Sequence, residues 1–320
     1  MAKAIEQLGS GLTVGHATLG LYGDGIGSVK QQVHDGDTVN VRAAGNFGVR
    51  LLGVDAPEIS FTLPPEDRFA QLSDARWEEF LSDPFAEDLP SFDLPLDPGL
   101  LEHLRERTGP GVATNHHEHA SAAEDALEAE ILGDMEALGQ TEEEFGFFLA
   151  FAYEVIDGYG RFLCFINREQ PDADEPEPRP KSYNERLLAA GRVSPYFIWP
   201  NVDPFLKKGT VAAAVIVPGG AAELAGADNS LGFARGLVRD AQQARLGVFD
   251  TEDPLRLEPF EVRYLSRRRP PDRWMIDLSD DGDFLIPPQE YYTVPDAEDR
   301  LFVPEEYVPL FVEAGWRRRL

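Results

Sequence analysis

Cysteine and lysine are both scarce in this sequence. Cys164 is the only cysteine among the 320 residues, so no disulfide bond can form within the chain. It lies in the mostly apolar run F-L-C-F-I, where we expect a small buried thiol. Only five of the 29 basic residues are lysine, so arginine supplies most of the positive charge.

Long apolar runs are also missing. The longest, residues 211–217, is too short to cross a bilayer. The first ten residues contain no uninterrupted apolar segment of the kind found in secretory signals. We therefore expect a cytoplasmic protein with no membrane partner. Hydrophobic residues make up 42% of the chain, which is enough for a core and excludes global disorder.

Positive charge is in short supply. The chain has 57 acidic and 29 basic residues and a net charge of −28, whereas proteins that bind nucleic acid usually carry a basic surface. Residues 59–144 contain 22 acidic and four basic side chains, a net of −18. The excess of acid is therefore concentrated in one segment. The rest of the chain carries the remaining net charge of −10.

The segment from residue 34 to residue 58 combines carboxylates with an arginine. It reads H-D-G-D-T-V-N-V-R-A-A-G-N-F-G-V-R-L-L-G-V-D-A-P-E and contains Asp35, Asp37, Arg50, Asp55 and Glu58. Hard divalent cations such as Ca²⁺ bind clustered carboxylate and carbonyl oxygens. The planar guanidinium of an arginine matches phosphate oxygens. Together these groups predict phosphodiester hydrolysis, although the D-G-D triplet alone would be typical of a solvated turn.

The same residues carry a family resemblance. The pattern D-G-D-T…R-L-L-x-V-D-A-P-E resembles the metal and catalytic core of the staphylococcal nuclease (thermonuclease) family. Two further blocks follow in the order of that family, D-G-Y-G-R at 157–161 and Y-N-E-R-L-L-A-A-G at 183–191. The resemblance covers roughly residues 28–60 and 145–250, and it leaves the rest of the chain unassigned.

The resemblance implies an α+β fold built on a five-stranded OB-type β-barrel with helices packed around it. We expect four segments: an N-terminal segment at 1–27, a discontinuous nuclease domain at 28–58 and 145–250, an acidic helical insert at 59–144, and a C-terminal extension at 251–320. Within the insert, apolar spacing predicts helices over 65–81, 98–107 and 118–138. A hairpin is expected over 145–166, and further helices over 184–191, 231–246 and 304–316.

The resemblance also implies a set of site residues. Asp37 and Asp55 would bind Ca²⁺ directly, Asp35 through water, and the residue at Ala56 through its backbone carbonyl. Arg50 and Arg161 would bind the scissile phosphate, and Glu58 would orient or deprotonate the attacking water.

Aromatic side chains complete the expected site. Tyr159, Phe197 and Trp199 stand where the family contacts the nucleotide, and stacking on such rings suits unpaired bases. Core packing is an equally good interpretation of Phe197.

Two other motifs have weaker interpretations. The run H-H-E-H at 116–119 lacks a distant zinc ligand, so we expect a polar loop before the third helix of the insert. The arginines at 267–269 and 273, and those at 317–319, could contact phosphate or pair with the acidic insert of this chain or of a neighbour. The net charge favours the pairing.

The sequence thus predicts a Ca²⁺-dependent endonuclease of the thermonuclease type. It would hydrolyse DNA, with single strands favoured and RNA as a further substrate, with little sequence preference, and leave 3′-phosphate ends. The rival interpretation is a non-catalytic OB-type scaffold that binds nucleic acid or protein. A third is an active nuclease that its insert holds inactive until a partner or a change of salt concentration releases it. Self-association or binding of a regulatory partner would use the acidic insert or the arginine-rich tail.

Overall fold

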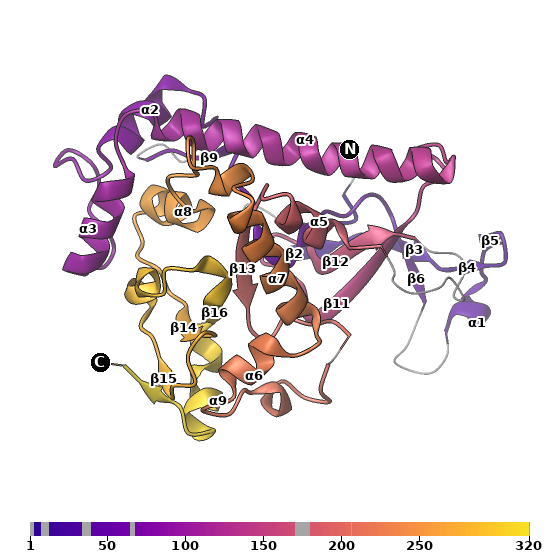
Figure 1. Cartoon of the computed structure of the whole chain (residues 1–320). Helices are drawn as coiled ribbons and strands as arrows, with labels where there is room; N and C mark the ends of the chain where they lie inside the picture. The colour runs from indigo at the N-terminus through magenta and orange to yellow at the C-terminus, as the bar shows by residue number, and fades with distance from the viewer. Residues whose placement is uncertain are drawn as a thin grey trace. The chain divides into compact units, whose positions relative to one another are not determined.

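The computed structural model describes residues 3–7, 13–33, 40–64, 68–169, 180–205 and 207–319. The chain divides into two compact units (Figure 1). Unit 1 comprises Met1–Leu51 and Glu154–Cys164, and unit 2 comprises Leu52–Tyr153 and Phe165–Leu320. Helices and strands both occur throughout, so the α+β class is confirmed.

Unit 1 is built from short strands. Three antiparallel pairs join β1 with β2, β3 with β6 and β4 with β5. The elements before the insert are β1 (Ile5–Gln7), β2 (Thr13–Gly15), β3 (Ala17–Leu19), β4 (Leu21–Tyr22), β5 (Gly25–Ile26), α1 (Val29–Gln32), β6 (Val41–Ala43) and β7 (Val49–Leu51). The predicted hairpin over 145–166 is confirmed as β11 (Phe147–Ile156) and β12 (Phe162–Arg168), and β12 also pairs with β7 in parallel.

Unit 2 contains a four-stranded sheet in the order β14-β16-β13-β8. Its strands are β8 (Gly53–Asp55), β13 (Ser194–Ile198), β14 (Trp274–Asp277) and β16 (Arg300–Val303). The inner strands β13 and β16 run parallel to each other and are almost wholly buried, as expected of strands covered on both faces. The C-terminal extension therefore supplies half of this sheet.

The insert folds into helices, and two of its three predicted boundaries need correction. The helix α3 (Pro98–Arg107) matches its prediction, with Pro98 in the first turn. The helix α2 (Ala75–Ser82) begins only after the Asp74 cap, because the residues before it form the hairpin of β9 (Ser60–Thr62) and β10 (Phe69–Gln71). The helix α4 (Val112–Leu138) begins before the histidine run, which is therefore helical and not a loop.

The remaining elements follow the insert. The helix predicted over 184–191 is confirmed as α5, which Ser182 caps and Gly191 follows with a φ of 62°. The helix predicted over 304–316 is a 3₁₀ turn followed by a short α-helix. The helices are α5 (Tyr183–Ala189), α6 (Ala221–Gly226), α7 (Ser230–Gln243), α8 (Pro259–Arg267) and α9 (Val308–Glu313); the 3₁₀ turns are η1 (Ala212–Ala214), η2 (Gly247–Phe249), η3 (Pro288–Thr293), η4 (Ala297–Asp299) and η5 (Glu305–Tyr307); the last strands are β15 (Phe284–Leu285) and β17 (Arg317–Arg318).

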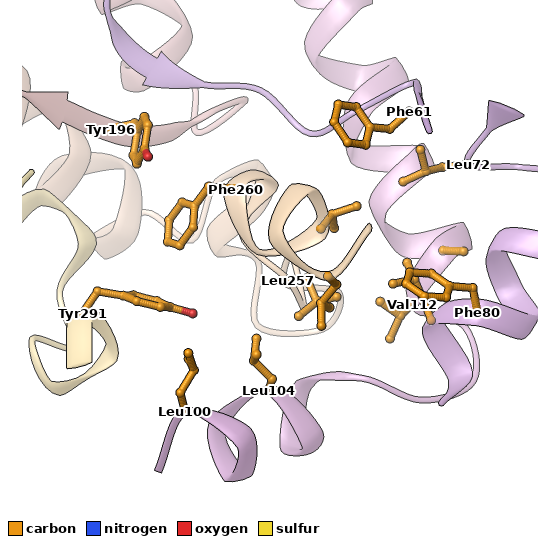
Figure 2. Close-up of a cluster of buried hydrophobic side chains, with 14 of the residues drawn as sticks. Phe61, Leu72, Phe80, Leu100, Leu104, Val112, Tyr196, Leu257, Phe260 and Tyr291 are labelled. Carbon is orange, nitrogen blue, oxygen red and sulfur yellow. The ribbon is translucent and has the colours of Figure 1, made fainter. Parts of the chain in front are cut away.

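One hydrophobic cluster joins the insert to the C-terminal extension (Figure 2). Leu100 and Leu104 of α3 and Phe80 of α2 belong to it, together with Leu257 and Phe260 at the start of α8. Tyr196 of β13 also contributes its ring, which stacks on Phe260 with 5.4 Å between centroids. The insert and the extension, which the sequence separated into two segments, therefore share a core inside unit 2.

Buried charges join the same parts of unit 2. The carboxylate of Glu261 in α8 accepts hydrogen bonds from the Tyr291 hydroxyl at 2.5 Å and pairs with His103 of α3 at 3.0 Å. Burial alone would raise the pKa of this carboxyl, but Arg107 and His103 outweigh burial and hold the pKa at about 2. Removal of one partner from a buried ion pair leaves an uncompensated charge, so these contacts are costly to break.

The helix α4, the long magenta helix of Figure 1, is attached to α5 by a second buried carboxylate. Asp134 accepts a hydrogen bond from the Tyr183 hydroxyl at 2.9 Å and forms ion pairs with Arg186 at 2.9 Å and Arg168 at 3.2 Å. Burial, followed by Asp134, raises the pKa of Tyr183 above its usual value. The insert is thus anchored at both ends of its longest helix, since the backbone N–H of Gly111, directly before α4, donates to the carboxylate of Glu78 in α2.

The described strands form several small sheets and do not close into the expected five-stranded barrel. In the same described part of the chain, no helix combines the length and the apolar composition that a membrane crossing needs.

We predict that the Leu100→Ala variant loses about 2–5 kcal/mol of unfolding free energy, the usual effect of truncating a fully buried leucine. Leu100 is 0% exposed in the shared cluster, whereas Leu94, also in the insert, is 62% exposed. The Leu94→Ala control should change stability by no more than about 0.5 kcal/mol. Urea unfolding followed by tryptophan fluorescence measures both, and equal effects would contradict a core shared with the insert.

Candidate functional site

Asp55 stands at the end of β8, the edge strand of the unit 2 sheet. Its register partner is Ser194 of β13. Gly53 has a φ of 75°, a backbone conformation that favours glycine, two residues before Asp55. The Asp55 side chain is only 1% exposed. A carboxylate so far from water needs a compensating positive partner, because burial of an unpaired charge is very costly.

That partner is Arg263 of α8, in the C-terminal extension. Its two terminal nitrogens donate to the two carboxylate oxygens of Asp55, Nη1 to Oδ1 at 3.0 Å and Nη2 to Oδ2 at 2.6 Å. The Nη1 atom also donates to Oε1 of Glu58 at 2.8 Å. One guanidinium therefore holds the expected metal ligand and the expected catalytic carboxylate together.

Burial strengthens this arrangement. The side chain of Arg263 is 12% exposed and that of Glu58 is 23% exposed. Burial disfavours the charged guanidinium, but the negative charges of Asp55 and Glu58 outweigh burial, so the pKa of Arg263 lies above its usual value. Bidentate pairs of arginine with carboxylate are among the strongest hydrogen-bonded pairs in proteins. The cluster is a three-residue salt bridge in which one guanidinium binds two carboxylates.

The insert contributes His116 to the same cluster. This side chain is 0% exposed, and its Nε2 atom accepts a hydrogen bond from the backbone N–H of Glu58 at 2.9 Å. An accepting Nε2 leaves the proton of the neutral ring on Nδ1. Burial, followed by the positive charge of Arg263, lowers the pKa of His116 to about 3. The ring is therefore neutral at physiological pH and fixes the backbone position of Glu58.

The described residues do not fit a Ca²⁺ ion in this arrangement. Ca²⁺ takes about six to eight oxygen ligands, and no three His, Cys, Asp or Glu side chains gather as a metal site in the described part of the chain. The predicted ligands Asp35 and Asp37 lie outside the described residues. Ala56, expected to offer its carbonyl, is exposed beside Asp55. Both oxygens of Asp55, however, already accept hydrogen bonds from Arg263.

In unit 1 the two predicted phosphate-binding arginines share one face of a strand pair. Arg50 of β7 is the register partner of Leu163 in the parallel strand β12. Because side chains alternate along a strand, Arg161, two residues before Leu163, lies on the same face as Arg50. A Cβ atom at Gly48 would lie 3.2 Å from Cγ of Arg161. The arginine side chain therefore lies against the glycine that directly precedes β7.

Arg161 is held in place by its own hairpin. Its Nε and Nη2 atoms both lie 2.8 Å from Oδ2 of Asp157, and its side chain is 38% exposed. The ring of Tyr159 lies 5.3 Å from the guanidinium carbon and is 57% exposed. The ring of Tyr159 is thus exposed, and its contact with a base stays a prediction.

The two other predicted nucleotide-binding residues are not available. Phe197 is 3% exposed and Trp199 is 2% exposed. Trp199 donates from Nε1 to the carbonyl of Ala214 at 3.2 Å and meets the ring of Phe311 edge to face. The strand β13 that carries Phe197 is an inner strand of its sheet, so these aromatic rings belong to the core. The packing interpretation given for Phe197 is therefore correct, and Trp199 is buried in the core as well.

The arginine cluster at 267–269 contacts the insert of the same chain. Pairing with the insert, and not contact with phosphate, was the alternative that the net charge favoured. Arg269 pairs with Asp93 at 2.8 Å, and Arg268 donates to the carbonyls of Pro84 and Pro90 at 2.6 and 2.7 Å. The arginines at 317–319 pair instead with acidic residues of the extension itself, Asp283, Glu305 and Glu290.

Arg263 and His116 were missed by the sequence reasoning. A signal for α8 was present, since Pro259 follows a capping glutamate, Glu258, and Glu261 completes a capping box. Nothing in the sequence indicated that Arg263 would meet Asp55, because the two residues are far apart along the chain. The partner of His116 is equally distant, so only the fold identifies it.

A comparison of the chain with models of known families, with curated proteins and with solved structures found no match in any of the three.

The neutral state of His116 predicts a pH dependence of stability. The unfolded chain takes up a proton near the ordinary histidine pKa of 6.5, but the folded chain does so only near 3. Stability is therefore present above pH 6.5 and falls as the pH is lowered toward 3. Between pH 7 and pH 5 the loss from this residue is about 2 kcal/mol.

We expect the His116→Gln variant, which keeps an acceptor for the Glu58 N–H, to lack this part of the decrease. The matched control is His117→Gln on the same helix, where His117 is only partly buried. Urea unfolding at pH 7, 6 and 5 measures the slope for the parent and both variants. An unchanged slope in His116→Gln would mean that His116 already takes up its proton in the folded state.

Proposed function

We propose that this protein is a Ca²⁺-dependent phosphodiesterase of the nuclease type, similar in chemistry to the thermonuclease family that its motifs resemble. The observation that carries the proposal is the register of β7 with β12, which puts Arg50 and Arg161 on one face of the strand pair. These strands lie on either side of the insert in the sequence. Their pairing brings the R-L-L block next to the D-G-Y-G-R block, as a shared site requires.

Two guanidinium groups on one face suit a phosphodiester that gains negative charge during reaction. Preorganised positive groups stabilise the transition state more than the ground state. Glu58 would accept a proton from the attacking water, whose oxygen forms the new bond to phosphorus. The bond from phosphorus to the 5′ oxygen breaks, and that oxygen takes up a proton from solvent. The products would be a 3′-phosphate and a 5′-hydroxyl.

An OB-type fold belongs to the proposal as well, although the described strands do not close into a barrel. Parallel neighbours such as β7 and β12 need a long crossover connection, and the insert with β11 supplies it. The expected ligands of the cation are Asp35, Asp37, Asp55 and the carbonyl of Ala56, which together offer only hard oxygen atoms. In the described structure both oxygens of Asp55 accept hydrogen bonds from Arg263.

The proposed substrate is DNA, with RNA as a second substrate and single strands preferred. The exposed ring of Tyr159 beside Arg161 supports this preference, because stacking on one aromatic face suits an unpaired base. A cytoplasmic location is part of the same proposal.

Purified protein incubated with single-stranded and double-stranded DNA, in Ca²⁺ and in EGTA, tests the activity. Cleavage that needs Ca²⁺ and leaves 3′-phosphate ends is the expected result. No cleavage of either substrate over a wide range of Ca²⁺ concentration would reject the proposal.

Substitution of the paired arginines tests the residues. We predict that Arg50→Ala and Arg161→Ala each lower turnover by about 10²–10³-fold, the usual loss on removal of one transition-state donor. The control is Arg42→Ala, an exposed arginine on β6 of the same unit. Its turnover should stay within about twofold of the parent, since distant surface changes rarely matter. Equal turnover by the parent and all three variants would show that Arg50 and Arg161 do not take part in catalysis.

A non-catalytic scaffold is the second candidate, and two observations favour it. Arg263 neutralises Asp55 and Glu58 as a structural partner would, and burial removes Phe197 and Trp199 from any ligand. A scaffold would bind nucleic acid or protein without cleaving it, and Arg50→Ala would then change affinity alone.

A further inference from the structure

The segment that joins α2 to α3 contains no helix or strand (Figure 1). We call residues 83–94 of this segment the strap. Among the described residues, one backbone hydrogen bond joins the strap to the rest of the chain, from the N–H of Asp93 to the carbonyl of Arg268 at 2.8 Å. Pro84 and Pro90 have no N–H to donate. The strap is therefore held mainly by side chains.

Arg268, directly after α8, supplies much of that attachment. Its Nε atom donates to the carbonyl of Pro90 at 2.7 Å, and its Nη1 atom donates to the carbonyl of Pro84 at 2.6 Å. Its guanidinium carbon lies 4.0 Å from the centre of the Phe92 ring. The residue is 8% exposed. Burial lowers the pKa of Arg268, as expected where no carboxylate among the described residues balances the charge.

The backbone of Arg268 has a conformation that is usual for glycine. Its φ is 54° and its ψ is 38°, in the left-handed region that other residues disfavour. Helices commonly end on a glycine in this conformation. A larger residue persists there only where its neighbours hold it in place. The side-chain contacts that hold Arg268 are those with the strap.

Aromatic rings extend the attachment to α3. The ring of Phe92 stacks with that of Phe85, with 6.4 Å between centroids and 21° between planes. The guanidinium carbon of Arg105 in α3 lies 5.6 Å from the centre of the Phe85 ring. The strap thus places two half-buried rings between a cation of α3 and a cation of α8. Contacts between a cation and a partly exposed ring are weak, so they break more easily than the core.

We propose that the strap opens as a unit from the cleft between α3 and α8, and that Arg268 is the latch that keeps it closed. The inference goes beyond the proposed nuclease activity and does not depend on it. The closed strap borders an open space of about 210 Å³. The lining of this space is mostly apolar and includes Phe92 of the strap, Leu104 of α3 and Leu265 of α8. Opening removes Phe92 from the lining and uncovers the cleft.

A fixed part of the core is the alternative, and it predicts a different result. Phe85, Leu89 and Phe92 pack against the hydrophobic cluster. If these contacts are decisive, the strap unfolds only together with α3 and α8, and its amides exchange hydrogen only in global unfolding. A strap that opens as a unit exchanges through a local opening that leaves the sheet in place. Hydrogen exchange of the full, unmodified chain separates the two.

The amide of Asp93 reports on the strap, and the amide of Trp199, which donates to the carbonyl of Phe302 at 2.8 Å, reports on the sheet. After correction for intrinsic rates, we expect Asp93 to exchange at least about a hundredfold faster, because local openings are more frequent than global ones. Low urea concentrations should leave the Asp93 rate unchanged and raise the Trp199 rate, since global unfolding exposes far more surface. An Asp93 rate that rises with urea as steeply as that of Trp199 overturns the inference.

Substitution of the latch tests Arg268 itself. The Arg268→Gly variant removes the side-chain contacts and suits the backbone conformation. We expect exchange at Asp93 to become at least about tenfold faster, while the rate at Trp199 stays that of the parent. The matched control is Arg245→Gly, because Arg245 is an exposed residue after α7 that also has a positive φ, of 57°. The control relieves the same conformation without touching the strap, so its Asp93 rate should equal that of the parent.

A second variant, Arg268→Lys, keeps the charge and much of the side chain and so guards against a failure of the glycine variant to fold. Lysine lacks the fixed fork of N–H groups that bonds both proline carbonyls. Exchange at Asp93 should therefore again be faster than in the parent. The parental Asp93 rate in both Arg268 variants overturns the latch. Equal acceleration of the Asp93 and Trp199 amides would show that the strap is a fixed part of the core, and it overturns the inference as well.

Discussion

A buried negative charge must be balanced, and in unit 2 that requirement organises the contact between three distant parts of the sequence. Asp55 ends an edge strand of the motif segment, Arg263 comes from the C-terminal extension, and His116 comes from the insert. The arginine balances Asp55 and Glu58, while the neutral imidazole orders the backbone of Glu58. An unpaired carboxylate at this depth would be very unfavourable. The motif segment therefore depends on the extension for the balance of its charge.

The hydrophobic cluster provides the same connection in apolar form. Leu100 and Leu104 of the insert belong to one cluster with Leu257 and Phe260 of the extension, and the ring of Tyr196 in the sheet stacks on Phe260. The excess of acidic side chains in the insert therefore lies on its outer surface, while its apolar side chains lie in the core. A segment can carry a large negative charge and still be an integral part of a core, provided that its apolar residues face one side.

Local sequence signals succeeded where a local cause decides the structure. Pro98 and the spacing of Leu100 and Leu104 are sufficient to predict α3, and Ser182 with Gly191 is sufficient to predict α5. The same local signals failed where contacts between distant residues decide the structure. The start of α4 precedes its polar histidines because His116 is buried against Glu58, and a run of polar residues does not reveal a buried partner. Phe197 and Trp199 look equally suited to stacking and to packing until their neighbours are known.

The sequence by itself determined the groups available for chemistry: two arginines in two separated motifs, a set of carboxylates, one thiol and an excess of acid in one segment. It also determined the alternation along β7 that lets Arg50 share a face with Arg161 once β12 pairs beside it. Only the tertiary structure decided that Arg263 would neutralise Asp55 and Glu58 and that Phe197 would be buried. The physical reason is distance along the chain. Propensity, capping and periodicity act over a few residues, whereas ion pairs and packing are formed between residues that only the completed fold brings together.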